Sequence, residues 1–199
     1  MTNCLKIDWP RLDSQLHNQL IKCFDNNKSS VKMLSIKAPG SNEITHHNTS
    51  NYKGFFHLFE WDTKEQFFSE LLKDYSVNTE FLNKLSIQQS RGSVSPHADF
   101  NRKVIAYYLV EGMAQTVFYS TNKPVISGTS YHDKTHELKE IERVTMQPGS
   151  WYLFNTYQIH SVECSFDTKR TSLAMDLTSI FDDYENAVKK IGLEQILFK

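Results

Sequence analysis

The sequence predicts an α+β fold with a double-stranded β-helix (jelly-roll) core, N-terminal supporting helices and a C-terminal helix. Short β-rich runs crowd the second half of the chain, whereas apolar residues recur at helical spacing near its start and its tail. A length of 199 residues suits one domain. We expect residues 1–84 to form a helical and β support, 85–178 the jelly-roll core, and 179–199 the closing helix.

The first part of the chain predicts three helices, the last of them short, and two strands around a polar loop. Leu12, Leu16 and Leu20 share one face of a helix that follows Pro10. A second helix is expected near Thr63, which has capping-box spacing to Gln66. The remaining expected elements are strands at 31–37 and 54–61, a loop at 41–53 and a short helix at 79–85.

At least seven short β-rich runs follow, separated by turns and loops. They are KLSIQQS, KVIAYYLV, QTVFYS, IERVTM, SWYLF, HSVEC and RTSLAMDL. Such a succession of short strands is typical of a jelly-roll. The tail DDYENAVKKIG has acids at its start, lysines near its end and Gly192 placed to stop it, which predicts the closing helix.

Composition narrows the possible classes of protein. The formal net charge is −1, from 22 basic and 23 acidic residues, which argues against a nucleic-acid partner. No apolar run is long enough for a membrane span, and the start lacks the apolar core of a signal peptide. We therefore expect a cytoplasmic protein without a membrane partner. Three cysteines without a CxxC pair give little support to disulfides or a cysteine-based zinc site.

A metal site is predicted from His97, Asp99 and His160. In an extended segment, His97 and Asp99 point to the same side and can reach one ion together. His160 enters a β-rich run behind the Pro148-Gly149 turn and is the best candidate for a third ligand. Two imidazoles and one carboxylate form the facial set associated with non-haem Fe(II), which leaves positions for a co-substrate and oxygen.

Arg170 adds a binding site for an anion. It lies ten positions after His160, and Ser172 follows two residues later, so both side chains can face one ligand. A guanidinium inside a β-barrel is costly unless paired, and a dicarboxylate supplies a bidentate partner. Taken alone, Arg170 would be read as a surface residue opening a strand.

In combination, the HxD pair, the distal histidine and the arginine within RxS resemble the Fe(II)- and 2-oxoglutarate-dependent oxygenases. The resemblance covers roughly residues 85–178, and RKVIAYYLVEG with FNTYQIHSV looks most like aspartyl/asparaginyl β-hydroxylase-like members. Prolyl-hydroxylase-like enzymes share the same layout. The resemblance implies that His97, Asp99 and His160 bind iron, that Arg170 grips the distal carboxylate of 2-oxoglutarate, and that Ser172 assists.

Further cofactor-binding candidates lie close to these residues. One of Tyr107 and Tyr108 must face inward, and Gln88 and Gln89 pose the same choice on the preceding run. We single out Tyr107 as a possible co-substrate contact. Asn155 could orient the distal histidine or a co-substrate, but its residue type also suits a turn. Arg102 could contact the substrate, but it also suits a solvent-facing position.

These observations predict a dioxygenase that uses Fe(II), 2-oxoglutarate and O2 to hydroxylate a peptidyl side chain, an amino acid or a small metabolite. Two alternatives stay open. A cupin-type metal enzyme would use the same ligands without depending on Arg170, and a catalytically silent jelly-roll binding module would need neither iron nor oxygen.

Overall fold

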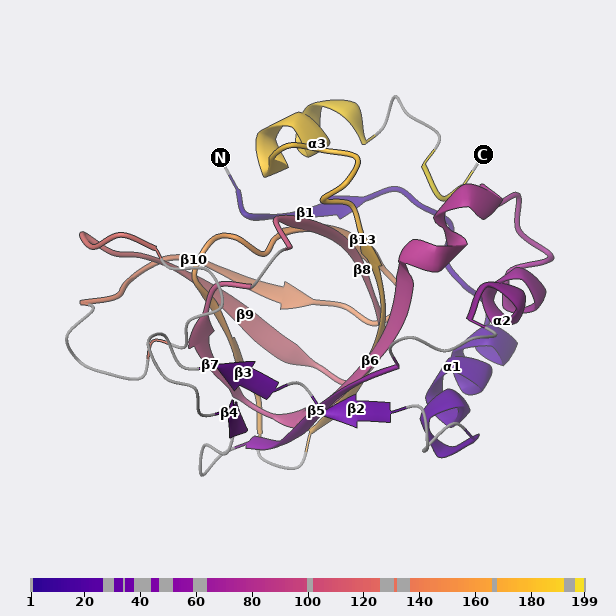
Figure 1. The fold of residues 1–199 in the computed structure, drawn as a ribbon, viewed down its shortest axis with the longest axis horizontal. Coiled ribbons are helices and arrows are strands. Elements are labelled where there is room, and N and C mark those ends of the chain that lie inside the picture. The colour runs from indigo at the N-terminus through magenta and orange to yellow at the C-terminus, as the bar shows by residue number, and fades with distance from the viewer. Residues whose placement is uncertain are drawn as a thin grey trace.

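Two antiparallel sheets stack on one another, and helices cover the outer face of the larger sheet (Figure 1). The computed structural model describes residues 2–26, 31–33, 35–37, 44–46, 52–58, 64–99, 102–125, 131, 137–165, 168–191 and 196–198. The described helices are α1 (Ser14–Asn26), α2 (Lys64–Leu71), the 3-10 helix η2 (Thr79–Lys84) and α3 (Tyr184–Lys190).

The larger sheet has seven strands in the order β1-β11-β8-β13-β6-β5-β2. Their bounds are Cys4–Ile7 (β1), Trp151–Asn155 (β11), Val104–Glu111 (β8), Lys169–Asp176 (β13), Leu85–Gly92 (β6), Tyr52–Leu58 (β5) and Val31–Met33 (β2). The smaller sheet has four strands in the order β10-β9-β12-β7. Its strands are Lys139–Met146 (β10), Ala114–Ser120 (β9), His160–Glu163 (β12) and Val94–His97 (β7). A separate hairpin joins β3 (Ser35–Lys37) to β4 (Ile44–His46).

Among the eight strands from β6 to β13, the first pairs with the last, the second with the last but one, and so on toward the middle of the segment. β6 pairs with β13, β7 with β12, β8 with β11 and β9 with β10, and every pair is antiparallel. This nesting divides the eight strands between the two sheets and brings segments far apart in sequence side by side. The arrangement fits a jelly-roll β-sandwich.

The seven β-rich runs are all strands, and the closing segment forms α3, whose Asp183 side chain accepts a hydrogen bond from the backbone of Asn186. The predicted loop at 41–53 was wrong in part, because it contains β4, where the β-branched pair Ile44-Thr45 favours extended backbone. The predicted strand at 31–37 is divided into β2 and β3, which belong to different sheets.

Besides β4, two further strands among the described residues were not predicted. β7 contains Pro96, which lowers strand propensity, and the structure places this strand at the edge of the smaller sheet, where a missing N–H is tolerated. β1 has four residues and pairs with β11 at the edge of the larger sheet, and it was missed although the equally short β12 was predicted.

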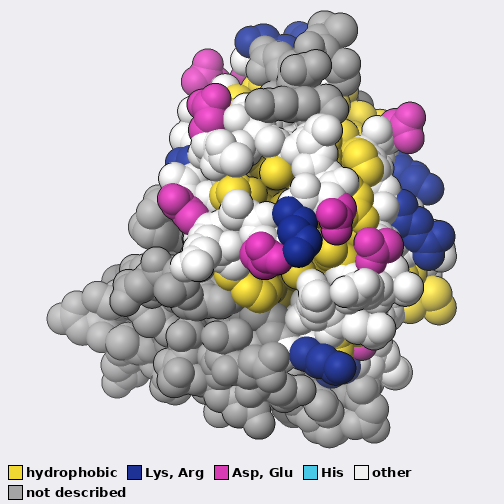
Figure 2. All heavy atoms as spheres, turned by 90° about the vertical axis from the view of Figure 1, so that its right-hand side faces the viewer, with side chains coloured by type: hydrophobic (Ala, Val, Ile, Leu, Met, Phe, Trp, Pro, Cys, Tyr) yellow, Lys and Arg dark blue, Asp and Glu magenta, His cyan; other side chains and the backbone are white. Residues whose placement is uncertain are grey.

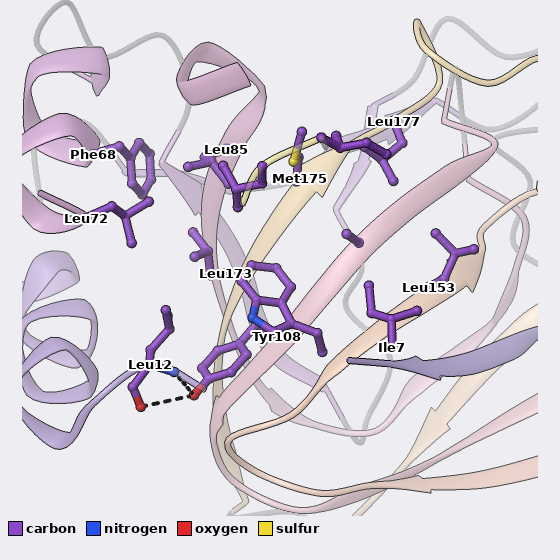
Figure 3. Close-up of a cluster of buried hydrophobic side chains, with 14 of the residues drawn as sticks. Ile7, Leu12, Phe68, Leu72, Leu85, Tyr108, Leu153, Leu173, Met175 and Leu177 are labelled. Atoms are coloured by element: carbon purple, nitrogen blue, oxygen red, sulfur yellow. Dashed lines mark hydrogen bonds between the residues drawn. The ribbon is translucent and has the colours of Figure 1, made fainter. Parts of the chain in front are cut away.

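The larger sheet has an apolar core on each face. On its outer face, Leu173 and Met175 of β13 pack with α1, α2 and the segment that follows β13 (Figure 3). Figure 3 also shows Tyr108 among these side chains, where its hydroxyl accepts a hydrogen bond from the backbone N–H of Leu12 at 3.2 Å. Between the sheets, a second cluster includes Leu109, Phe118 and Phe154. Because β8 is buried on both faces, its sequence VIAYYLVE is a nearly continuous apolar run.

The helix-bearing side of the molecule presents a mixed surface. Figure 2 shows this side, where the described Lys and Arg side chains are interspersed with Asp and Glu. None of the helices within the described ranges is both long enough and apolar enough to cross a membrane.

Candidate metal centre

The three predicted ligands meet where β7 ends and β12 begins. His97 is the last residue of β7, and His160, the first of β12, stands opposite it in the antiparallel register. The two imidazole centroids are 4.4 Å apart. Asp99 follows two residues after His97, and its backbone N–H donates to the carbonyl of Thr156 at 2.9 Å. One ligand atom from each of the three side chains lies within 4.8 Å of the others.

Backbone hydrogen bonds orient both imidazoles in the same way. Nδ1 of His97 lies 2.8 Å from the carbonyl oxygen of Ser95, and Nδ1 of His160 lies 2.8 Å from that of Gln158. A carbonyl only accepts, so each Nδ1 carries the proton and donates it. In the neutral form of each ring, Nε2 then keeps a lone pair, and Nε2 of His97 lies 3.5 Å from Oδ1 of Asp99. This is the tautomer that a metal-binding imidazole needs.

The electrostatics of the site fix the charges of His160 and Asp99. Burial, with a smaller contribution from His97, lowers the pKa of His160 to about 3, so this imidazole is neutral at neutral pH. Burial alone would raise the pKa of Asp99, but the Arg102 guanidinium and the two imidazoles outweigh it and hold this pKa well below its usual range. Nη2 of Arg102 lies 2.6 Å from Oδ2 of Asp99. A neutral imidazole and an ionised carboxylate are the forms that bind metal.

These three donors fit a divalent transition metal with open coordination positions. Within the part of the chain that the structure describes, they are the only group of three or more His, Cys, Asp or Glu side chains that could hold one ion. A closed structural zinc site needs four protein ligands, whereas two histidines and one carboxylate leave room for exogenous ligands.

The three ligands open into a cavity of about 80 Å³ between the two sheets. Its other polar lining residues are Gln88, Arg102, Tyr107, Thr116, Thr156 and Arg170. Its apolar lining consists of Val94, Ile105, Met146, Phe154 and Val162. The smaller sheet and the loop after β7 supply the triad, and the larger sheet supplies Arg170.

Arg170 is buried in this cavity, and no carboxylate among the described residues pairs with it. The residue is 7% exposed, and its Nη2 donates to Oγ of Ser90 at 2.7 Å. Its Nε has no hydrogen-bond partner among the described residues. A buried guanidinium held by one hydroxyl is costly to desolvate unless an anion joins it. Ser172 is also buried and stands opposite Gln88 in the register, but it does not line the cavity.

Strand alternation sorts the remaining candidates. Tyr107 and Gln88 line the cavity. Tyr108 faces the outer core, and the side chain of Gln89 approaches the hydroxyl of Thr171 at 3.4 Å.

Asn155, predicted as a cofactor contact, lies outside the cavity. Its Nδ2 donates to Oδ1 of Asn3 at 3.0 Å, and its Oδ1 accepts from the backbone N–H of Gln158 at 3.3 Å. Asn155 thus stabilises the turn that precedes β12, because its side-chain oxygen accepts a hydrogen bond from a backbone N–H of that turn.

Sequence reasoning missed the contact between Arg102 and Asp99. Arg102 was considered as a substrate contact or a solvent-facing residue, yet it lines the cavity and is paired with Asp99. Opposite charges three residues apart were a usable signal, but the local backbone that brings them together could not be read from the spacing.

Comparisons with known proteins give only distant likenesses. No protein-family model matches the chain, and no curated protein does. Among solved structures, the non-heme alpha ketoglutarate dependent epimerase SnoN from nogalamycin biosynthesis is 10% identical, with a TM-score of 0.45 over 87% of this chain and 78% of that one. SnoN in complex with Fe3+, alpha ketoglutarate and nogalamycin RO is 9% identical, with a TM-score of 0.47 over 88% and 80%.

This chain covers a smaller share of two further solved structures. The hydroquinone 1,2-dioxygenase PnpCD, in complex with Cd2+ and 4-hydroxybenzonitrile, is 12% identical, with a TM-score of 0.35 over 47% of this chain and 58% of that one. The protein ycfD of E. coli is 12% identical, with a TM-score of 0.41 over 95% and 52%. At such low similarity, the function has to be derived from the site.

Proposed function

We propose that this protein is a non-haem Fe(II) and 2-oxoglutarate-dependent dioxygenase with a double-stranded β-helix core. It would hydroxylate a peptidyl side chain, an amino acid or a small metabolite and release succinate and CO2. One observation carries the proposal: a triad of two histidines and one carboxylate shares a single cavity with a buried arginine that has no anionic partner among the described residues.

A ligand that binds both the metal triad and Arg170 needs two chemically different ends. One end must occupy the coordination positions that the triad leaves open, and the other must bring negative charge to Arg170. A 2-oxo acid with a distal carboxylate has both ends. When bound, Fe(II) supplies oxygen activation: one atom of O2 enters succinate as the 2-oxo acid loses CO2, and the other enters the hydroxylated product.

The chain's own residues position and protect this chemistry. Arg170, fixed by Ser90, would orient the co-substrate by its distal carboxylate. Apolar side chains such as Ile105, Met146 and Val162 line the cavity and exclude water. In the oxygenase superfamily that the sequence resembles, halogenases lack the metal-binding carboxylate, so the presence of Asp99 favours hydroxylation.

The proposal is tested by separating metal binding from co-substrate binding. We expect the anaerobic Fe(II) protein to bind 2-oxoglutarate in calorimetry and to release succinate in air when screened across peptides and metabolites. Arg170→Ala should weaken 2-oxoglutarate binding about a hundred-fold, because truncating one partner of a buried charge pair costs about 3 kcal/mol. Its affinity for the metal should persist, whereas His97→Ala should lose the metal.

Arg143→Ala is the control for loss of a guanidinium. Arg143 pairs with Glu140 at 2.7 Å and with Glu163, and it does not line the cavity. Wild-type protein that binds iron but not 2-oxoglutarate would contradict the proposal and favour a metal enzyme of cupin type. Equal 2-oxoglutarate affinity in Arg170→Ala and wild type would remove the role assigned to Arg170.

A further inference from the structure

Gln88 lies beside Arg170 on the same wall of the cavity. It belongs to β6, and Arg170 belongs to the neighbouring β13, where it stands opposite Ser90. Gln88 and Ser90 are two residues apart on one strand, so their side chains share the inner face of the larger sheet. Gln88 is 4% exposed and lines the cavity.

The amide of Gln88 and the guanidinium of Arg170 share an unusual property. Among the buried side-chain nitrogen and oxygen atoms of the described residues, Nε2 of Gln88 and Nε of Arg170 are the two without a hydrogen-bond partner. Buried donors are normally satisfied, and both of these belong to residues that line one cavity. Two neighbouring donors left open in this way indicate a ligand group that accepts several hydrogen bonds.

A carboxylate is such a group. It has two oxygens with about four lone-pair sites, and it donates nothing when ionised. Arg170 supplies the charge, and Ser90 holds one of its terminal nitrogens, which fixes the direction of the guanidinium. An uncharged amide beside it adds a directed donor without adding a second charge.

We propose that Gln88 donates a hydrogen bond to the same distal carboxylate that Arg170 binds, and thereby selects a 2-oxo acid that carries this group. This inference rests on the proposed function and assigns Gln88 as a specificity-determining residue. Substitution of Gln88 should therefore act on the distal end of the co-substrate and leave its metal-chelating end unaffected.

The test compares two ligands that share the chelating end. 2-Oxoglutarate carries the distal carboxylate, and 2-oxobutyrate lacks it. Gln88→Met keeps the length of the side chain and removes the donor, so the Kd for 2-oxoglutarate should rise about ten-fold, as for loss of one hydrogen bond to a charged group. The Kd for 2-oxobutyrate should not change. Both constants are measured by calorimetry on the anaerobic Fe(II) protein.

Gln88→Glu is the second variant, because it is nearly isosteric and replaces the donor by a carboxylate. The introduced charge should repel 2-oxoglutarate and pair with Arg170, and the affinity should fall more than in Gln88→Met. Gln89→Met is the matched control, since the neighbouring amide approaches Thr171 on the opposite face of the sheet. It should bind both acids like wild type.

Equal affinity of Gln88→Met and wild type for 2-oxoglutarate would overturn the inference. An equal loss of affinity for both acids would overturn it too, because the effect would then lie at the chelating end or in the fold. These outcomes leave the proposed function intact. Failure of the wild-type protein to bind 2-oxoglutarate would instead remove the proposed function, and the assignment of Gln88 with it.

Discussion

Arg102 makes the largest contribution to keeping Asp99 ionised. Its Nη2 lies 2.6 Å from the carboxylate, which is otherwise buried and would be easier to protonate. In Arg102→Gln we expect the pKa of Asp99 to rise and the affinity for Fe(II) or Mn(II) to fall about ten-fold, the loss typical of residues that orient metal ligands. Anaerobic calorimetry at pH 7 and pH 6 measures both effects.

The loss should be larger at pH 6, where protons compete better for Asp99. Arg143→Gln removes an exposed arginine from the smaller sheet and should bind metal like wild type. A pH-independent loss in Arg102→Gln would show that Arg102 acts on the metal site by packing and not by charge.

His160 should make the metal-free protein sensitive to mild acid. Its pKa is about 3 in the fold, against an ordinary value of 6.5, so between these values the unfolded chain binds the extra proton. The contribution of the neutral His160 to the free energy of unfolding is therefore fully present above pH 6.5 and is lost as the pH falls toward 3. Between pH 7 and pH 5, we expect this residue alone to lower the free energy of unfolding by about 2 kcal/mol.

Urea unfolding in the presence of a chelator measures this loss at both pH values. His160→Asn removes the titrating group, and its free energy of unfolding should fall less between pH 7 and pH 5 than that of wild type. Parallel pH dependences in the two proteins would contradict the prediction.

At the scale of residues, the sequence indicated which side chains could bind a metal or an anion, but not which way every candidate side chain points. The spacing of His97, Asp99, His160 and Arg170 singled them out, because ligand types and strand alternation are local properties. Which of Tyr107 and Tyr108 faces inward could not be decided, because both faces of β8 are buried and the usual polar-outside signal is absent. Asn155 depended on the course of a turn and lies outside the cavity.

At the scale of elements, the connection from β8 to β9 constrains Arg170. Gly112 has a φ of +87°, and a Cβ there would lie 2.3 Å from the carbonyl oxygen of Lys169 and 2.8 Å from Cγ of Arg170. Gly112→Ala should lower the free energy of unfolding by about 3 kcal/mol through backbone strain and overpacking. It should also weaken 2-oxoglutarate binding about ten-fold while metal binding persists, because the arginine must move. Chemical denaturation and calorimetry measure these quantities.

Gly149→Ala is the matched control in a second turn. Gly149 has a φ of +79°, but a Cβ there would meet the guanidinium of Arg11, the nearest atom being Nε at 2.8 Å. That side chain is exposed and can move aside. The variant should lose about 1 to 2 kcal/mol from strain and keep wild-type affinity for 2-oxoglutarate. Equal effects of the two substitutions on this affinity would contradict the role given to Gly112.

Element prediction succeeded where the period of the pattern was long enough to read. The seven β-rich runs and the segments at α1 and α3 had that length. β7 is interrupted by Pro96 and was missed, and so was β1. Pairing could not be read from the local sequence, because it depends on long-range contacts such as that of β6 with β13.

At the scale of the whole molecule, the two cores should have separable effects. Phe198, near the end of the chain, packs against Trp9 and Trp151 with ring centroids 5.6 and 5.7 Å away, on the outer face of the larger sheet. Phe198→Ala should lower the free energy of unfolding by about 3 kcal/mol and change tryptophan fluorescence. Metal affinity should not change, since the site lies on the other side of the sheet.

Phe118→Ala provides the comparison from the inner core. The Phe118 ring is fully buried, 6.1 Å from that of His160. This variant should lose both stability and metal affinity, as followed by denaturation and calorimetry. A loss of metal affinity in Phe198→Ala as large as that in Phe118→Ala would show that the two faces of the sheet are coupled.

The division of the site between two sheets has a consequence for the evolution of co-substrate preference. Under the proposed function, the smaller sheet and the loop after β7 hold the metal end of the ligand, and β6 and β13 hold its other end. Packed sheets lie about 10 Å apart, a distance set by the side chains between them. The distance between the two sheets then determines which length of 2-oxo acid fits. Leu109 and Phe118 lie in the core between the sheets and help to set this distance. Substitutions that never touch the bound acid can therefore change the co-substrate preference.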